Sequence, residues 1–291
     1  MPPSRPSIDV SAMKHTASEF DFSTPQVMAI VNVTPDSFYA GSRMRTPEAV
    51  TRRIREAVEE GAAILDIGGY SSRPGAAEIS VEEEWSRVRA GLEAARREAP
   101  DTAVSVDTFR SEVARRALEE FGPVIINDIS AGELDPAILE VVARGDVPYI
   151  AMHMKGDPQT MQTLTNYRRD ITSEVVDYFQ TRVEQLLAAG IRRERIVLDP
   201  GFGFAKTLEQ NYELLAGLHR LRALGFPVLA GLSRKSMIYK ALGVTPEESL
   251  AGTVALDWEC LRQGATLLRV HDVREAVDTV RLFRIYERNR D

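Results

Sequence analysis

RIVLDPGFGFAKTLEQNYELLAGLHRLRALG, residues 195–225, contains the pattern that decides the fold of this 291-residue chain. Its short apolar run stops at Asp199, and a segment with apolar residues at helical spacing follows from Leu208. A buried strand that ends in a polar residue and leads into an amphipathic helix is a βα unit. The rest of the chain repeats this unit.

Eight apolar runs end in this way, and each is followed by a helix-periodic segment. The runs are VMAIVN (27–32), AAILDIGG (62–69), AVSVDT (103–108), VIIND (124–128), PYIAMH (148–153), RIVLDPG (195–201), PVLAGLSRK (227–235) and TLLRVHD (266–272). They stop at Asn32, Asp66, Asp107, Asn127, His153, Asp199, Ser233 with Lys235, and Arg269 with His271. Eight successive βα units predict a single α/β domain, the (β/α)8 TIM barrel.

Length and composition fit one such domain. A barrel of this class needs about 250 residues, which leaves residues 1–26 as an N-terminal extension before a barrel of residues 27–291. We find no signal-peptide core and no run long enough to span a membrane, and the single Cys260 excludes an internal disulfide framework. The sequence therefore predicts a cytoplasmic protein with Cys260 in its core. A net charge of −7 argues against a nucleic-acid partner.

The polar strand ends are the candidate functional residues. In a (β/α)8 barrel the active site collects at the carboxyl ends of the strands, so residues far apart in sequence would meet in one pocket. Any single Asp or Asn at such a position can instead cap a helix or a turn. Eight together favour a functional pocket over a wholly structural account.

The loops after the first two strands predict contacts with a phosphorylated ligand. Asn32 offers a neutral, hard amide oxygen suited to Mg²⁺ that is already bound to phosphate oxygens, and the TPDS turn after it predicts a mobile loop. The second loop presents Ser72 and Arg73 after two adjacent glycines and before Pro74. An arginine among hydroxyls suits a phosphate or a carboxylate.

The remaining strand ends divide into two sets. Small acceptor side chains on three strands, those of Asp107, Asn127 and Asp199, suit a flat heterocycle with adjacent N–H donors, such as a guanine-like or pterin-like edge. Cationic and hydroxyl side chains follow the last two strands, where these barrels often bind anions. Ser233 and Lys235 follow the seventh strand, and Lys235, Arg269 and His271 predict a phosphate or diphosphate site.

Eight motifs in this order resemble the dihydropteroate synthase family over residues 27–272. They are NVTPDSF, GGYSSRPGA, SVDT, INDISAG, MHMKGDPQTMQ, DPGFGFAK, GLSRKS and RVHDV. Two positions depart from the family pattern GGESTRPG, since Tyr70 stands for Glu and Ser72 for Thr. Ser72 keeps the hydroxyl, whereas Tyr70 puts the local loop conformation in question.

The resemblance implies a transferase that joins 6-hydroxymethyl-7,8-dihydropterin diphosphate to p-aminobenzoate and releases pyrophosphate. It implies a pterin site of Asp107, Asn127, Asp199 and Lys235, and a diphosphate site of Asn32 with Mg²⁺, Ser72, Arg269 and His271. The p-aminobenzoate site would consist of Phe38, Arg73, Pro74, Phe204 and Ser233. The residues expected to act in catalysis are Asp107, Lys235, Arg269 and His271. The partners implied are these small molecules and a second copy of the chain in a homodimer, with no membrane partner.

Three alternatives stay open at this point. A pterin-binding methyltransferase domain shares the barrel and the Asp/Asn set but has no use for a diphosphate site, so NVTPDSF, Lys235 and the RVH motif argue against it. A non-catalytic paralogue would bind a pterin without releasing pyrophosphate. A purely structural barrel would leave the eight polar strand ends unexplained.

Overall fold

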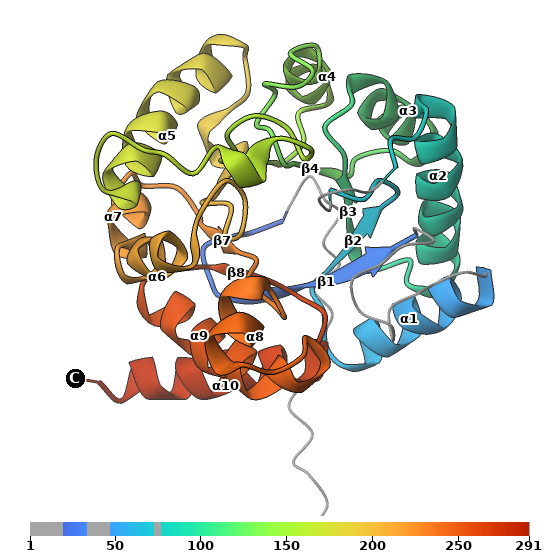
Figure 1. Ribbon diagram of the computed structural model, residues 1–291. Coiled ribbons are helices and arrows are strands. Elements are labelled where there is room, and N and C mark those ends of the chain that lie inside the picture. Colours follow the sequence, from blue (N-terminus) through green and yellow to red (C-terminus); the bar gives the residue numbers. More distant parts are fainter. Residues whose placement is uncertain (1–19, 34–46, 73–76, 291) are drawn as a thin grey trace, which may run out of the picture.

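The computed structural model describes residues 20–33, 47–72 and 77–290, and it places eight parallel strands in a ring surrounded by helices (Figure 1). The strands are β1 (Gln26–Asn32), β2 (Ile64–Gly68), β3 (Ala103–Asp107), β4 (Ile125–Asp128), β5 (Tyr149–Met152), β6 (Ile196–Asp199), β7 (Leu229–Ala230) and β8 (Leu267–Val270). They pair in the order β6-β5-β4-β3-β2-β1-β8-β7. A bridge from Leu198 of β6 to Val228 completes the ring. The predicted (β/α)8 barrel is confirmed.

The helices form the outer layer of the molecule (Figure 1). They are α1 (Pro47–Glu59), α2 (Val81–Glu98), α3 (Ser111–Phe121), α4 (Ile138–Gly145), α5 (Ile171–Ala188), α6 (Leu208–Ala216), α7 (Leu218–Arg222), α8 (Ser236–Leu242), α9 (Leu250–Arg262) and α10 (Val273–Arg288). Short 3₁₀ turns are η3 (Met161–Thr163), η4 (Arg193–Arg195) and η5 (Glu247–Ser249). Strand and helix alternate as the sequence pattern predicts, with two exceptions. One predicted helical segment forms both α6 and α7, and the helix α8, which the pattern did not predict, precedes α9 between β7 and β8.

The start and the break of that segment have local causes. Thr207 caps α6, because its hydroxyl accepts from the backbone N–H of Gln210 while the Gln210 side chain accepts from the backbone N–H of Thr207. The helix then ends at Gly217, where an added Cβ would lie 2.5 Å from the hydroxyl of Thr172 on α5. The glycine at the break therefore allows α5 to approach closely.

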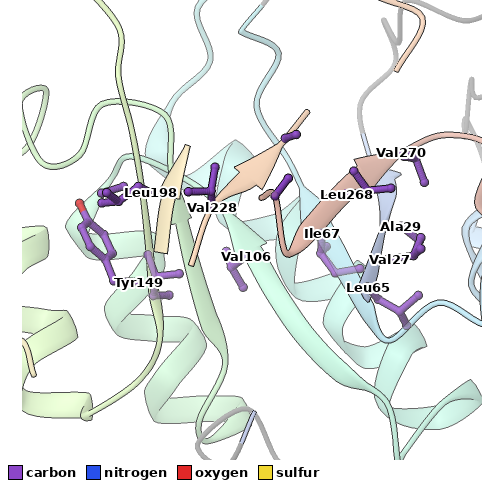
Figure 2. Close-up of a cluster of buried hydrophobic side chains, with 14 of the residues drawn as sticks. Val27, Ala29, Leu65, Ile67, Val106, Tyr149, Leu198, Val228, Leu268 and Val270 are labelled. Carbon is purple, nitrogen blue, oxygen red and sulfur yellow. The ribbon is translucent and has the colours of Figure 1, made fainter. Parts of the chain in front are cut away.

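The larger hydrophobic core lies between the strands and the helices. Outward-facing residues of neighbouring strands pack side by side in it, among them Val27 and Ala29 of β1 and Leu65 and Ile67 of β2 (Figure 2). Burial on both faces explains why the strands read as continuous apolar runs. This packing holds the strands, and therefore the polar residues at their ends, in fixed positions.

A second apolar cluster fills the lower part of the barrel interior, on the amino-terminal side of the polar strand ends. It consists of Met28, Ile64, Ala103, Ile125, Ile150, Val197, Leu229 and Leu267, one residue from each strand. Phe20 and Phe22, which precede β1, are buried in the same cluster. The end of the predicted N-terminal extension thus packs against the interior of the barrel.

Two further sequence predictions concern the cysteine and the membrane. Cys260 is buried on α9, as predicted, and burial raises the pKa of its thiol well above the usual range. The thiol therefore stays neutral. Within the described ranges, we find no helix whose length and apolar character would let it cross a membrane.

Candidate active site

Arg269 at the end of β8 joins side chains from three other strands inside the barrel. Its Nε donates to Asp66 Oδ2 of β2 at 2.6 Å, and its Nη2 donates to Asp107 Oδ2 of β3 at 2.6 Å. The side-chain amide of Asn127 on β4 donates to the same Asp66 oxygen at 3.1 Å. We call these four residues the Arg269 cluster. Three of them were singled out in the sequence for binding, and Asp66 was noted only as a strand end.

Burial sets the electrostatics of the Arg269 cluster. Burial alone would lower the pKa of Arg269, but Asp66 and Asp107 outweigh it and the pKa is raised, so the guanidinium keeps its charge. Burial raises the pKa of Asp107 to about 7, with Arg269 opposing and Asp66 adding to the shift. Asp66 is fully buried, and its Oδ1 has no hydrogen-bond partner among the described residues. That oxygen could accept a hydrogen bond from a ligand or a water.

Asn32 lies beside the Arg269 cluster, across Gly68. An added Cβ at Gly68 would lie 3.3 Å from Asn32 Oδ1 and 3.5 Å from Asp107 Oδ2, so both oxygens face the same small space. These are hard oxygen donors of the kind that Mg²⁺ prefers, and Mg²⁺ is commonly completed by substrate phosphates and water. Within the described residues no group of three or more His, Cys, Asp or Glu could hold a metal by itself. The donor set therefore fits Mg²⁺ that shares its ligands with a phosphorylated substrate.

His271 follows β8 and pairs with Ser233, which follows β7. The Ser233 hydroxyl accepts from the His271 backbone N–H at 3.2 Å and lies 3.1 Å from His271 Nδ1. Burial, together with the nearby Arg269, lowers the pKa of His271 to about 3, so the ring is neutral. With its oxygen already accepting, the hydroxyl can donate to Nδ1, which places the ring hydrogen on Nε2. His271 then offers one N–H to an anion.

Lys235 and Asp199 form the opposite side of the site. Lys235 precedes α8, and its Nζ donates to the Phe202 carbonyl at 2.5 Å and lies 4.8 Å from the centre of the Phe204 ring. Burial lowers the pKa of Lys235 to about 8, and Asp199 opposes this. Asp199 is itself buried and accepts from the backbone N–H of Gly201 at 2.8 Å. Burial raises the pKa of Asp199, against the influence of Lys235.

Some predicted site residues are not joined to these groups. Phe38, Arg73 and Pro74 lie outside the described residues. Ser72 is half-buried, and within the described part of the chain it makes no hydrogen bond to the Arg269 cluster. Ser233 was assigned to the second-substrate side but contacts His271 of the diphosphate side, so one hydroxyl links two predicted subsites.

Tyr70, the residue that departs from the family pattern, is packed in an aromatic group. Its ring meets Phe109 edge-on at 5.1 Å, and the Arg110 guanidinium lies over the Tyr70 ring at 5.3 Å. Arg110 in turn pairs with buried Glu84 at 3.1 Å. The loop after β2 is thus anchored at Tyr70 to the loop after β3.

Sequence reasoning gave no role to two groups near the site. Asp66 was noted only as a strand end, although it is the main partner of Arg269. Lys206 is 4% exposed, and its Nζ contacts His153 Nδ1 at 2.9 Å. The signal for Lys206 was its place in DPGFGFAK, a loop too apolar to solvate a lysine.

Comparisons with known proteins identify the family of this chain. A model of the pterin binding enzyme family matches residues 28–271. The dihydropteroate synthase of Escherichia coli K12 is 43% identical over 265 residues, which cover 91% of this chain and 93% of that protein. The dihydropteroate synthase of Synechocystis is 45% identical over 248 residues, with 85% of each chain covered.

Solved structures of high similarity belong to the same family. A Yersinia pestis dihydropteroate synthase with a sulfonamide drug complex superposes with a TM-score of 0.87 at 39% identity, covering 92% of this chain and 96% of that chain. The Xanthomonas albilineans enzyme with 4-aminobenzoic acid superposes with a TM-score of 0.83 at 42% identity, covering 91% of this chain and 94% of that chain. The same enzyme with 7,8-dihydropteroate superposes with a TM-score of 0.81 at 39% identity, covering 92% of this chain and 95% of that chain. This chain belongs to the pterin-binding enzyme family and, within it, to the dihydropteroate synthases, which are transferases.

Proposed function

We propose that this protein condenses 6-hydroxymethyl-7,8-dihydropterin diphosphate with p-aminobenzoate to give 7,8-dihydropteroate and pyrophosphate. The observation that carries the proposal is the Arg269 cluster, in which one buried guanidinium pairs with carboxylates from two strands, and an amide from a third strand donates to one of those carboxylates. Support also comes from the Xanthomonas albilineans structures, whose bound molecules are 4-aminobenzoic acid and 7,8-dihydropteroate.

The pterin ring would lie between the Arg269 cluster and Lys235. Asp107 and Asn127 on one side and Asp199 on the other present acceptors to the ring N–H and amino groups, and Lys235 donates to the oxo/N5 side. A site built from buried polar groups binds a ring with matching donors and rejects rings without them, since unmatched groups would be left unpaired. The unpartnered Asp66 Oδ1 offers one more acceptor beneath this site.

The diphosphate would bind where β1, β2 and β8 end. The Nε2–H of neutral His271, the guanidinium of Arg269 and the hydroxyl of Ser72 supply donors, and Asn32 would hold Mg²⁺ together with phosphate oxygens. When bound, Mg²⁺ supplies positive charge that stabilises the departing diphosphate. Arg269 spends two of its five N–H donors on Asp66 and Asp107, so the others could reach the anion, and a loosened contact would free the Asp107 carboxylate for the ring.

The reaction needs no nucleophile from the protein. The bond between the pterin methylene carbon and the diphosphate oxygen breaks, and Arg269 and His271 stabilise the charge that develops on the leaving group. Positive charge spreads into the electron-rich ring, where the carboxylate of Asp107 favours it. The amine nitrogen of p-aminobenzoate then forms the new C–N bond and loses one proton, so the products are dihydropteroate and pyrophosphate.

The p-aminobenzoate would bind on the outer side of the pterin. Phe204 and Ser233 are the described residues proposed for this subsite, and Phe38, Arg73 and Pro74 are proposed from the family resemblance. If this subsite is completed only after the diphosphate binds, it would keep water from the cation-like ring.

The decisive experiment mixes purified protein with both substrates and Mg²⁺ and follows pyrophosphate and dihydropteroate together. Equal amounts of the two products support the proposal. Pterin binding without pyrophosphate release would instead identify a non-catalytic paralogue. Methyl transfer to another acceptor would identify the methyltransferase alternative.

We also propose that the protein forms a homodimer through its C-terminal helices. Leu282, Ile285 and Tyr286 of α10 are 61%, 50% and 46% exposed, and Tyr286 lies beside Trp258 of α9. Contiguous exposed apolar residues of this size are typical of interfaces. Light scattering should give a dimer mass for the wild type and a monomer for Leu282→Glu. The cytoplasmic location of the protein stays a prediction.

A further inference from the structure

The loop between β6 and α6, residues 200–207, has its backbone held by side chains. It lies outside the helices and strands, yet each carbonyl oxygen from residue 201 to residue 206 accepts a side-chain hydrogen bond. The donors are Lys206 Nζ to Gly201 (3.1 Å) and Phe204 (2.9 Å), Lys235 Nζ to Phe202 (2.5 Å), Gln162 to Gly203 (3.3 Å), Tyr167 to Ala205 (3.0 Å) and Asn211 to Lys206 (3.4 Å). Side-chain donors thus replace the ladder that a regular element would provide.

The backbone of this loop needs such support. Gly201, Gly203 and Ala205 all have positive φ, of 70°, 81° and 51°. An alanine in the left-handed region is disfavoured and persists only where its surroundings fix it. At Gly201 an added Cβ would overlap the carbonyl oxygen of His153, so the loop also presses against the end of β5. The loop shape is therefore imposed by its contacts.

Lys206 makes more of these contacts than any other donor. Its Nζ reaches two loop carbonyls and, at 2.9 Å, the Nδ1 of His153. Its Nζ therefore meets three acceptors, all within hydrogen-bond distance. Burial lowers the pKa of His153 well below its usual range, so the ring is neutral and can accept at Nδ1. Among the described residues, Lys206 has no carboxylate within ion-pair distance, and its hydrogen bonds go to the loop and to β5 instead.

The loop held by Lys206 carries groups of the candidate site. Phe204 presents its ring to Lys235 at 4.8 Å, and the neighbouring Phe202 carbonyl accepts from the same lysine. A shift of the loop would therefore move the aromatic ring and the partner of Lys235 together. The Arg269 cluster lies on other strands and has no hydrogen bond to Lys206.

We propose that Lys206 is a positioning residue that fixes the β6–α6 loop so that Phe204 faces the second substrate. The inference rests on the proposed function for the identity of that substrate. Loss of the Lys206 side-chain donor should then impair the p-aminobenzoate side of the site more than the pterin side, which keeps Asp107 and Asn127 on other strands. A residue that only stabilises the fold would instead lower the amount of active enzyme and leave both Michaelis constants alone.

The test compares Lys206→Met with Lys240→Met, which makes the same change at an exposed position on α8. In steady-state assays we expect the KM for p-aminobenzoate to rise about tenfold or more in Lys206→Met, because small misplacements of a bound reactant are costly. The KM for the pterin diphosphate should rise less, by about threefold at most. Lys240→Met should match the wild type. Equal changes in both constants, or none, in folded Lys206→Met would overturn the proposal.

Hydrogen exchange gives a readout that does not depend on turnover. The Phe204 N–H donates to Gly201 O at 3.0 Å, so its amide reports on the loop. Exchange over residues 200–206 should accelerate in Lys206→Met and stay at the wild-type rate in Lys240→Met. Unchanged exchange in Lys206→Met contradicts the proposal even if the protein makes no dihydropteroate. Absent turnover in the wild type would reject the proposed function alone.

A milder variant covers the case in which Lys206→Met does not fold. Tyr167→Phe removes only the donor to Ala205, at the far side of the same loop. We expect the same selective rise in the KM for p-aminobenzoate, about threefold, with faster exchange at residues 203–206. Wild-type values for both quantities would show that side-chain contacts do not set the loop position.

Discussion

The barrel interior has two levels that are built from the same strands: the lower level is apolar and the upper level is polar. The lower level includes Ile64 of β2, Ile125 of β4, Val197 of β6 and Leu267 of β8. The upper level has Asp66, Asn127, Asp199 and Arg269 on those same four strands. Each pair is two residues apart, and side chains at i and i+2 of a strand point to the same face.

This two-residue spacing separates the residues that stabilise the fold from those proposed to bind the substrate. At the lower level, burial of one apolar residue per strand favours folding. At the upper level the same burial works against the charged groups, and it shifts the pKa values of Asp107, Asp199 and Lys235 toward their neutral forms. The hydrogen bonds of the Arg269 cluster offset part of that cost. Two inward-facing residues that lie two positions apart on one strand therefore have different roles, one in stability and the other in binding.

The largest expected effect comes from breaking the upper level at Asp66. In Asp66→Ala, Arg269 would keep only Asp107 and the Asn127 amide would lose its acceptor. Removing one partner of a buried ion pair should lower the free energy of unfolding by about 3–5 kcal/mol. Urea denaturation measures this. Asp278→Ala, which removes an exposed partner of Arg281 on α10, should cost less than about 0.5 kcal/mol. Equal stability of the two variants would show that the Arg269 cluster does not hold the barrel.

A paired substitution on β4 sharpens the contrast between levels. Ile125→Ala should lower the free energy of unfolding by about 2–5 kcal/mol through lost packing, with pterin affinity unchanged. Asn127→Ala should weaken pterin binding by about 1–3 kcal/mol, because a ring donor would be left unpaired. Denaturation and calorimetry with a pterin ligand measure the two quantities. If Ile125→Ala weakens pterin binding as strongly as Asn127→Ala, the two levels are not separable.

His271→Ala tests the anion side of the upper level. It should weaken binding of the diphosphate substrate by about 1.5–3 kcal/mol, the range for a hydrogen bond to a charged group. Binding of a pterin without the diphosphate should be unaffected. His219→Ala on α7, where exposed His219 lies 2.9 Å from the side chain of half-buried Gln263, serves as the control for calorimetry. Equal losses for both ligands would remove His271 from the diphosphate site.

The smallest effect is a pH dependence that comes from the buried lysines. Burial lowers the pKa of Lys206 from 10.5 to about 7, so between these values the unfolded chain binds more protons than the folded one. Stability should therefore rise with pH across this window and level off below a pH of about 7. In Lys206→Met the slope should decrease by about 1.4 kcal/mol per pH unit between pH 8 and 10. Urea denaturation at several pH values measures it. An unchanged slope would place the proton uptake elsewhere, and Lys240→Met should keep the wild-type slope.

Much of this architecture could be predicted from sequence because the strand endings repeat. The apolar runs locate all eight strands, and Asp107, Asn127 and Arg269 meet as expected for parallel strands in a barrel. The split between α6 and α7 could not be predicted, since it depends on the packing of Gly217 against Thr172. Helical periodicity reports on one face of a helix and not on its neighbours.

The details of the site were harder to predict than its members. Arg269 was assigned to an anion from its place after the last strand, and its partner Asp66 lies 203 positions away. Sequence order cannot show which strand end a long side chain will reach. Lys206 was missed because a lysine before a helix usually points to solvent, whereas here the carbonyls of a left-handed turn surround it.

The double pairing of Arg269 also bears on competition among anions in a cell. Its Nε and Nη2 each donate to a carboxylate, so a free inorganic phosphate that enters the barrel meets a guanidinium whose charge two acidic groups already offset. An anion attached to a ring with N–H donors comes with a replacement partner for Asp107. This arrangement would favour the intended substrate over the bare ion, because only the substrate carries both the anion and the ring donors.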